Sequence, residues 1–177
     1  ISPSSDTGYL QFTRPTPNTP PYYWDGRWHN LLLTRNNNTF SMYVDGVALT
    51  GPTGSVGTGN TVIDTIANRN NNGVPGYAIY NDAFTGELSN LVVWNSDQTS
   101  EKDNIYNNGS PNDLNNNGLT APTTWWKLNA DSVYTPSAPN YTTALDFVAS
   151  ESDYIDFGNI TALNNLSSFS SSSWFKT

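Results

Sequence analysis

The sequence predicts an all-β protein in which two antiparallel sheets pack face to face, with one short helix. Apolar and polar residues alternate in short runs, which is the period of a strand with one buried face. Asn, Gly, Ser, Thr and Pro fill almost every gap between these runs, as expected for tight turns. Leu31, Leu32 and Leu33 are consecutive, which is typical of a central strand covered on both faces. Because one layer cannot cover both faces of its own strands, this run indicates a second layer.

The strand pattern recurs along the whole chain. Strands are expected at residues 9–13, 27–35, 39–44, 62–67, 86–94, 125–128, 144–147, 154–157 and 169–176. In the third of these, Phe40, Met42 and Val44 fall on one face, which predicts a half-buried antiparallel strand. The asparagines at residues 36–38 and the pair Asp45-Gly46 bracket this strand and predict hairpin turns, because these residue types tolerate positive φ.

Residues 99–106 predict the one helix, with the hydroxyl of Thr99 at its start and acidic residues in its first turn. The polar, turn-rich residues 107–122 follow and are typical of a linker. We therefore expect residues 1–106 and residues 123–177 to belong to separate modules, or to separate parts of one rearranged module.

Composition excludes several classes of function. The chain has 177 residues, no cysteine and a formal net charge of −8. Its seven basic residues are scattered and neutralise few phosphates, so nucleic-acid binding is not expected. No apolar run approaches the roughly 20 residues of a membrane-spanning helix, so membrane insertion is not expected either. Without cysteine there is no disulfide, thiol nucleophile or thiolate metal site.

Three motifs carry a resemblance to a known family. They are Asp25-Gly26-Arg27-Trp28-His29, then Met42-Tyr43-Val44-Asp45-Gly46, then the segment 86–95 with sequence GELSNLVVWN. They resemble, in order, the D-G-x-W-H, L-Y-V-D-G and G-x-I-D-x-V-x-I-Y-N signatures of the laminin G-like members of the concanavalin A-like lectin/glucanase sandwiches. The resemblance implies a concanavalin A-like, two-sheet antiparallel jelly-roll sandwich, of which residues 1–106 form the C-terminal portion.

Residues 123–177 resemble the opening strands of a similar domain, which in the family precede the W-H strand. The chain is therefore cut from a tandem array, circularly permuted into one sandwich with Thr177 near Ile1, or completed by segments of other chains. The sequences Trp-Trp-Lys-Leu at residues 125–128 and Ala-Leu-Asp-Phe at residues 144–147 also resemble domains in structural proteins of tailed bacteriophages.

The sequence offers little for catalysis. Glycosidases of this fold need two converging carboxylates. Glu151 and Asp153 share a strand face but Asp156 does not, and the segment resembles an ordinary hairpin of the family, so a solvated turn is favoured. His29 is the only histidine, and its alternation with the leucines predicts a buried, structural side chain. We expect the chain not to be an enzyme.

Aromatic residues indicate candidate carbohydrate-binding sites, because exposed rings stack on sugars while amides and carboxylates fix the hydroxyls. The first is a platform of Tyr22, Tyr23 and Trp24 beside Asp25, and the second is Tyr77 with Tyr80. In the alternative interpretation these rings pack on the rim of the sandwich or on a neighbouring subunit.

A candidate Ca²⁺ site is formed by the oxygen-bearing side chains of Asp64, Asn70, Asn72 and Asp82. These residues lack the spacing of a calcium loop such as D-x-D-x-D-G, so turn-forming asparagines are the favoured alternative. No other cofactor is expected.

These features together predict a non-enzymatic structural or binding module of a virion or cell-surface appendage. It would act outside a cell, with other protein subunits as partners and cell-surface polysaccharide as a second ligand. A secreted carbohydrate-binding module is the alternative, and a glycoside hydrolase of the same fold is a lesser one.

Overall fold

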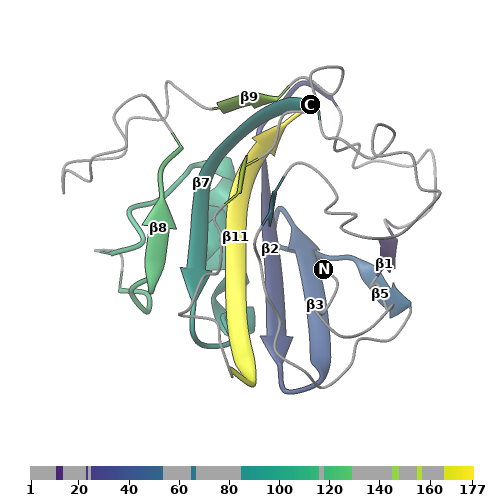
Figure 1. Cartoon of the computed structure of the whole chain (residues 1–177), viewed down its shortest axis with the longest axis vertical. Coiled ribbons are helices and arrows are strands. Elements are labelled where there is room, and N and C mark those ends of the chain that lie inside the picture. Colours follow the sequence, from purple (N-terminus) through teal and green to yellow (C-terminus); the bar gives the residue numbers. More distant parts are fainter. Residues whose placement is uncertain are drawn as a thin grey trace.

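The computed structural model describes residues 11–13, 23, 25–53, 65–66, 85–115, 118–128, 145–147, 155–156 and 166–177. Its main feature is a seven-stranded antiparallel sheet accompanied by one short helix (Figure 1). Six strands lie in the order β4 (Val47–Ala48), β3 (Thr39–Val44), β2 (His29–Asn36), β11 (Ser168–Lys176), β7 (Gly86–Trp94) and β8 (Thr124–Trp126). The seventh, β9 (Leu145–Phe147), pairs with residues 86–88 at the start of β7.

Two further antiparallel pairs lie outside this sheet. β1 (Gln11–Thr13) pairs with β5 (Thr50–Thr53), and β6 (Thr65–Ile66) pairs with β10 (Ile155–Asp156). Each of the expected strand segments therefore contains a strand, and a β-rich antiparallel fold is confirmed. The sequence pattern missed β4 and β5, because strands this short contain too few residues to show an alternation.

The expected turn at Asp45-Gly46 is confirmed. Asp45 has φ 52° and Gly46 has φ 75°, and the turn directly joins the paired residues Val44 and Val47. Two successive residues with positive φ make the tight hairpin whose twist matches that of the flanking strands. The first hairpin turn likewise contains Asn37 with φ 53°. These turns fix the register of β2, β3 and β4.

The expected helix is also confirmed, as a 3₁₀ turn, η2 (Thr99–Glu101), that continues into α1 (Lys102–Tyr106) and then η3 (Asn107–Gly109). The side chain at its start differs from the expectation. Asp97 Oδ1 accepts hydrogen bonds from the backbone N of Thr99 at 2.9 Å and from its hydroxyl at 2.6 Å. The stabilising acceptor is therefore the preceding carboxylate, which satisfies an N–H that the helix itself leaves unpaired.

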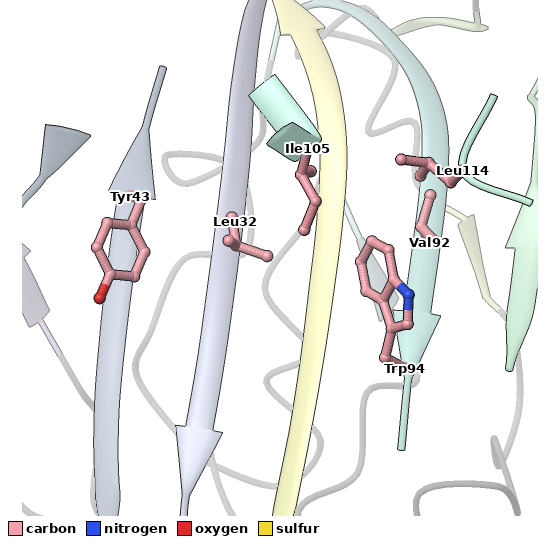
Figure 2. Close-up of a cluster of buried hydrophobic side chains, with 6 residues drawn as sticks. All are labelled: Leu32, Tyr43, Val92, Trp94, Ile105 and Leu114. Atoms are coloured by element: carbon pink, nitrogen blue, oxygen red, sulfur yellow. The ribbon is translucent and has the colours of Figure 1, made fainter. Parts of the chain in front are cut away.

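One face of the sheet packs beneath this helix (Figure 2). The buried cluster there consists of Leu32, Tyr43, Val92, Trp94, Ile105 and Leu114. Ile105 projects from α1 between β2 and β7, which places the helix over this face. The half-buried character expected of β3 is therefore wrong for Tyr43, which is only 8% exposed. Leu114 lies within the expected polar linker but is 5% exposed, so that segment contributes to the core.

The opposite face of the same strands is buried as well. Leu33, Phe40, Val44, Val93 and Phe169 share this face by register, and none is more than 7% exposed. The central strands are thus covered on both sides, as the run of leucines at 31–33 predicted.

β11 occupies the centre of the sheet, between β2 and β7 (Figure 1). On one side Phe169 faces Arg35 and Phe175 faces His29, and on the other Lys176 faces Glu87. Strands from before and after residues 107–122 therefore lie in one sheet.

Candidate functional site

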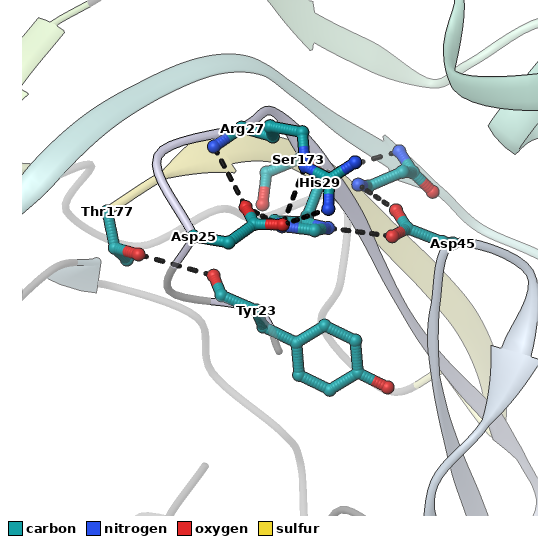
Figure 3. A network of polar contacts seen from close by, with 8 residues as sticks. Tyr23, Asp25, Arg27, His29, Asp45, Ser173 and Thr177 are labelled. Carbon is teal, nitrogen blue, oxygen red and sulfur yellow. Dashed lines mark hydrogen bonds and ion pairs between the residues drawn. The ribbon is translucent and has the colours of Figure 1, made fainter. Parts of the chain in front are cut away.

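The most elaborate polar arrangement in the described part of the chain is a cluster of Asp25, His29 and Asp45 (Figure 3). His29 Nδ1 lies 2.7 Å from Asp45 Oδ2, and His29 Nε2 lies 3.1 Å from Asp25 Oδ1. The imidazole is therefore held between two carboxylates. We refer to these three residues as the Asp-His-Asp cluster.

The sequence Asp25-Gly26-Arg27 positions the first carboxylate. Gly26 adopts φ 77°, a conformation that glycine allows, and the chain bends here directly before β2. Asp25 Oδ1 then accepts a hydrogen bond from the backbone N of Arg27 at 2.9 Å. Asp25 Oδ2 accepts from Arg27 Nε at 2.7 Å and lies 2.6 Å from Arg27 Nη2. Two guanidinium nitrogens therefore converge on one carboxylate oxygen, and this charge-assisted contact orients the carboxylate.

The hairpin turn after β3 positions the second carboxylate. Asp45 Oδ1 accepts a hydrogen bond from the backbone N of Asn30 at 2.9 Å, and the backbone N of Asp45 donates to Asn30 O at 3.0 Å. Since the other oxygen, Oδ2, contacts His29, the Asp45 side chain fastens the hairpin turn to the first residues of β2.

Hydrogen bonds dominate the electrostatics of Asp25. Partial desolvation by burial raises its pKa, but hydrogen bonds from the backbone and side chain of Arg27 and from His29, together with the guanidinium charge, lower it to about 2. The Asp25 side chain is 19% exposed and that of Asp45 is 21% exposed, so both carboxylates lie at the rim of the cluster.

Aromatic rings enclose the imidazole. The Tyr23 ring meets it edge-on, with centroids 5.6 Å apart, and the Phe175 ring lies 5.5 Å away at a tilt. Thr177 Oγ1 donates a hydrogen bond to the backbone O of Tyr23 at 3.2 Å. Together with these contacts of Phe175 and Thr177, the cluster ties the segment before β2 and the turn after β3 to the end of β11.

The geometry leaves little scope for catalysis at His29. A neutral imidazole donates one hydrogen bond, and only a ring protonated on both nitrogens donates to both carboxylates. In a Ser-His-Asp mechanism one nitrogen must instead face a nucleophile. Both nitrogens of His29 face carboxylates, and the residue is 6% exposed. The buried histidine expected from its alternation with Leu31 and Leu33 is thus confirmed.

No group of three or more His, Asp or Glu residues within the described segments is arranged to hold a metal ion. The candidate calcium ligands Asp64, Asn70, Asn72 and Asp82 lie outside the described residues. Calcium binding therefore stays a prediction.

The predicted carbohydrate platform is described only in part. Tyr23 is 5% exposed, so it does not offer the open ring face that stacking on a sugar requires, and the expectation for this residue is corrected. Its burial against His29 and near Thr177 is the physical reason. Asp25 already accepts hydrogen bonds from Arg27 and His29. Tyr22, Trp24, Tyr77 and Tyr80 lie outside the described residues.

The candidate glycosidase acids also fall largely beyond the description. Glu151 and Asp153 lie outside it, and Asp156 is described only as a residue of β10. Of the other glutamates, Glu87 forms an ion pair with Lys176, and Glu101 accepts a hydrogen bond from Asn104 at 3.0 Å.

Sequence reasoning missed a second polar arrangement, at the junction of β7 and β8. Asn90 has φ 52°, and its backbone N donates to Lys127 O at 3.1 Å. Its side-chain oxygen accepts from Trp125 Nε1 at 3.0 Å, and Lys127 Nζ lies 5.2 Å from the centre of the Trp125 ring. Leu128 follows with φ 53°. The register between β7 and β11 shifts between Ser172 and Trp174, opposite the part of β7 that contains Asn90. No local sequence signal predicts which asparagine interrupts a strand ladder in this way.

Comparison with known proteins gives no relative. No protein-family model matches the chain, and neither the curated proteins nor the solved structures contain a significant match. The resemblance to laminin G-like domains therefore stays a prediction. Among the described residues, no helix has both the length and the apolar character needed to cross a membrane.

Proposed function

We propose that the chain is a non-enzymatic structural and binding module of a virion or cell-surface appendage, acting outside a cell with other protein subunits as partners. The observation that carries the non-enzymatic part of this proposal is the Asp-His-Asp cluster. Its histidine has both ring nitrogens on carboxylates, and its carboxylates are engaged by the protein itself.

The cluster supports an architectural role for these residues. A catalytic base must reach a proton of the substrate, yet His29 is 6% exposed and enclosed by Tyr23 and Phe175. What the contacts do accomplish is to join three segments that lie far apart in the sequence. The best-formed polar site in the described part of the chain thus stabilises the fold.

We further propose that the seven-stranded sheet is one layer of a two-sheet, concanavalin A-like jelly-roll sandwich. Burial of Leu33, Val93 and Phe169 on the face away from the helix supports a second layer. Two antiparallel pairs outside the main sheet, β1 with β5 and β6 with β10, are candidate pieces of that layer. Sandwiches of this kind serve as scaffolds, lectins and enzymes, so the fold alone does not choose among these functions.

Composition supports a location outside the cell. Only 12% of the residues are charged and none is cysteine, while Asn, Gly, Ser and Thr are abundant. A cysteine-free sandwich rich in small polar residues suits a protein of a virion or cell surface. The alternative of a secreted carbohydrate-binding module loses support with the burial of Tyr23. It rests on Tyr22 and Trp24 and on the second candidate site, Tyr77 with Tyr80.

Polysaccharide hydrolysis assays test the non-enzymatic part of the proposal. We expect wild type and His29→Gln to release no reducing sugar from β-glucan, agar or carrageenan. Glu151→Gln serves as the second comparison, because Glu151 is the candidate glycosidase acid. Release of sugar by wild type that disappears in either variant would contradict the proposal.

A further inference from the structure

Among the described strands of the main sheet, backbone pairing connects the two halves only through β11. β2 and β7 do not pair with each other, and β11 lies between them. Without it, β4, β3 and β2 form one half, while β7, β8 and β9 form the other. We define the acceptor slot as the facing edges of β2 and β7. We propose that this slot also accepts β11 of a second copy of the chain, so that strand exchange joins copies. This inference rests on the proposed role in an assembly.

The slot recognises its strand first through the backbone. β11 runs antiparallel to both neighbours, with partners from Asn36 to His29 on β2 and from Trp94 to Glu87 on β7. A central strand with a ladder on each side is bound along its whole length, as in the addition of a strand to a sheet edge. The same ladders form whichever copy supplies the strand, which makes exchange a low-cost route to association.

Two buried donors, one in β2 and one in the segment that follows β7, favour an occupant of the slot with hydroxyl groups. Asn30 Nδ2 donates to Ser172 Oγ at 2.9 Å, and the backbone N of Gln98 donates to Ser170 Oγ at 2.8 Å. Asn30 is 1% exposed and Gln98 is 3% exposed, so both donors lie in the interior. An occupant without serine at these positions would leave these buried N–H groups without their hydroxyl acceptors, which weakens its pairing in the slot.

Aromatic contacts at the two ends of the slot require an aromatic side chain at each end of the bound strand. The Phe169 ring packs edge-on against Phe40, with centroids 6.4 Å apart, and Trp174 stacks on Tyr106 of α1 at 6.3 Å. The required pattern is thus Phe-Ser-x-Ser-x-Trp in an extended strand, which β11 itself supplies at residues 169–174. A second copy of this chain is therefore the partner that the slot fits.

Chain connectivity sets the concentration at which exchange competes with self-pairing. β9 ends at Phe147 and pairs with β7, and β11 begins at Ser168, so residues 148–167 tether the strand to its own slot. The effective concentration of a tethered partner falls roughly as the −3/2 power of the linker length, from the millimolar range of short linkers. At the high local concentration of an assembly, the strand of a neighbouring copy competes for the slot.

Engineered cysteines test the exchange directly, because the chain has none of its own. Asn36 and Ser168 face each other at the end of the β2 and β11 ladder, where Asn36 is exposed and Ser168 is partly buried. One copy carries Asn36→Cys and the other carries Ser168→Cys. The two are unfolded, mixed, refolded together at high concentration and oxidised. We expect a covalent dimer that contains one copy of each variant.

Two controls make the outcome decisive. The matched control replaces Asn36→Cys by Val47→Cys, since Val47 is 53% exposed but lies three strands away from β11. We expect several-fold less dimer from that pair. The second control carries Asn36→Cys and Ser168→Cys in one chain and is expected to close an intrachain disulfide when refolded in dilute solution. Failure of that bond would overturn the register that defines the slot, and the proposal with it.

Equal dimer yields from the two mixed pairs would overturn the exchange, because random collision would then explain the bond. Native mass spectrometry of refolded wild type separates this failure from failure of the proposed function. Assemblies without the specific cross-link retain the proposed function and reject exchange. A protein that stays monomeric at every concentration rejects both.

Discussion

His29 Nδ1 contacts Asp45 Oδ2 at 2.7 Å, which joins the first residue of β2 to the turn that follows β3. The same Asp45 side chain accepts a hydrogen bond from the backbone N of Asn30 at 2.9 Å. A single carboxylate therefore supports both the histidine and the start of a central strand. This relationship explains why a chain with one histidine buries it beside two acidic residues.

Removing that carboxylate should destabilise the fold. We expect Asp45→Ala to lower the free energy of unfolding by about 1 to 3 kcal/mol, because the buried His29 and Asn30 donors lose their acceptor. Asp103→Ala is a matched control, since the Asp103 side chain is 75% exposed and its ion pair with Lys102 lies at the surface. Urea denaturation of both variants measures the difference. Equal losses would show that the cluster does not support the fold.

Acid should weaken the contribution of Asp25. Its pKa is lowered from the ordinary 3.8 to about 2 in the folded protein. A carboxyl group with a lowered pKa contributes stability that is fully present above its unfolded value and is lost as the pH falls through its folded value. We expect the urea midpoint of wild type to approach that of Asp25→Asn between about pH 4 and pH 2. A constant gap between the two midpoints over this range would contradict the lowered pKa.

Truncating the buried end of β11 should be costly. Phe169 is 1% exposed and packs against Phe40. We expect Phe169→Ala to lower the free energy of unfolding by about 3 to 5 kcal/mol, the range for large aromatic residues in cores. Phe175→Ala on the same strand and face should cost less, because Phe175 is only partly buried. Chemical denaturation ranks the two, and the reverse order would place β11 differently in the sheet.

Glycan binding separates the two functional alternatives. If the chain is a structural module, wild type and Trp24→Ala should give the same signals on a glycan array. Tyr23→Ala is a poor probe of a sugar site, because removing this buried ring is expected to destabilise the fold. A signal present in wild type and absent only in folded Trp24→Ala would instead favour the carbohydrate-binding module.

The local sequence pattern predicted where the strands lie, but it did not predict which strands pair with each other. The continuous run Leu31 to Leu33 predicted a central strand, and the alternation of His29 with Leu31 and Leu33 predicted a buried histidine, since both depend only on neighbouring residues in one strand. The position of β11 between β2 and β7 depends on pairing across most of the chain, which no local pattern encodes. The sequence alone therefore left three arrangements open: a piece of a tandem array, one circularly permuted sandwich, and a sandwich completed by segments of other chains.

The Asp-His-Asp cluster likewise combines one contact that is local in the sequence with one that depends on strand pairing. Asp25 lies four residues before His29, so sequence proximity could have indicated that contact. Asp45 reaches the ring only because Val44 pairs with Leu31, a register that the hairpin turn sets. Tyr23 was expected to be exposed because it lies among aromatic residues after a proline-rich stretch, and the burial of an aromatic ring depends on tertiary packing.

The mass of wild-type chains under native conditions, measured from dilute to concentrated solution, tests the proposed assembly role most directly. We expect multimers whose share grows with concentration and which persist when the sample is returned to moderate dilution. A compact monomer at every concentration, without affinity for another protein subunit, would contradict a role as a component of a virion or cell-surface appendage.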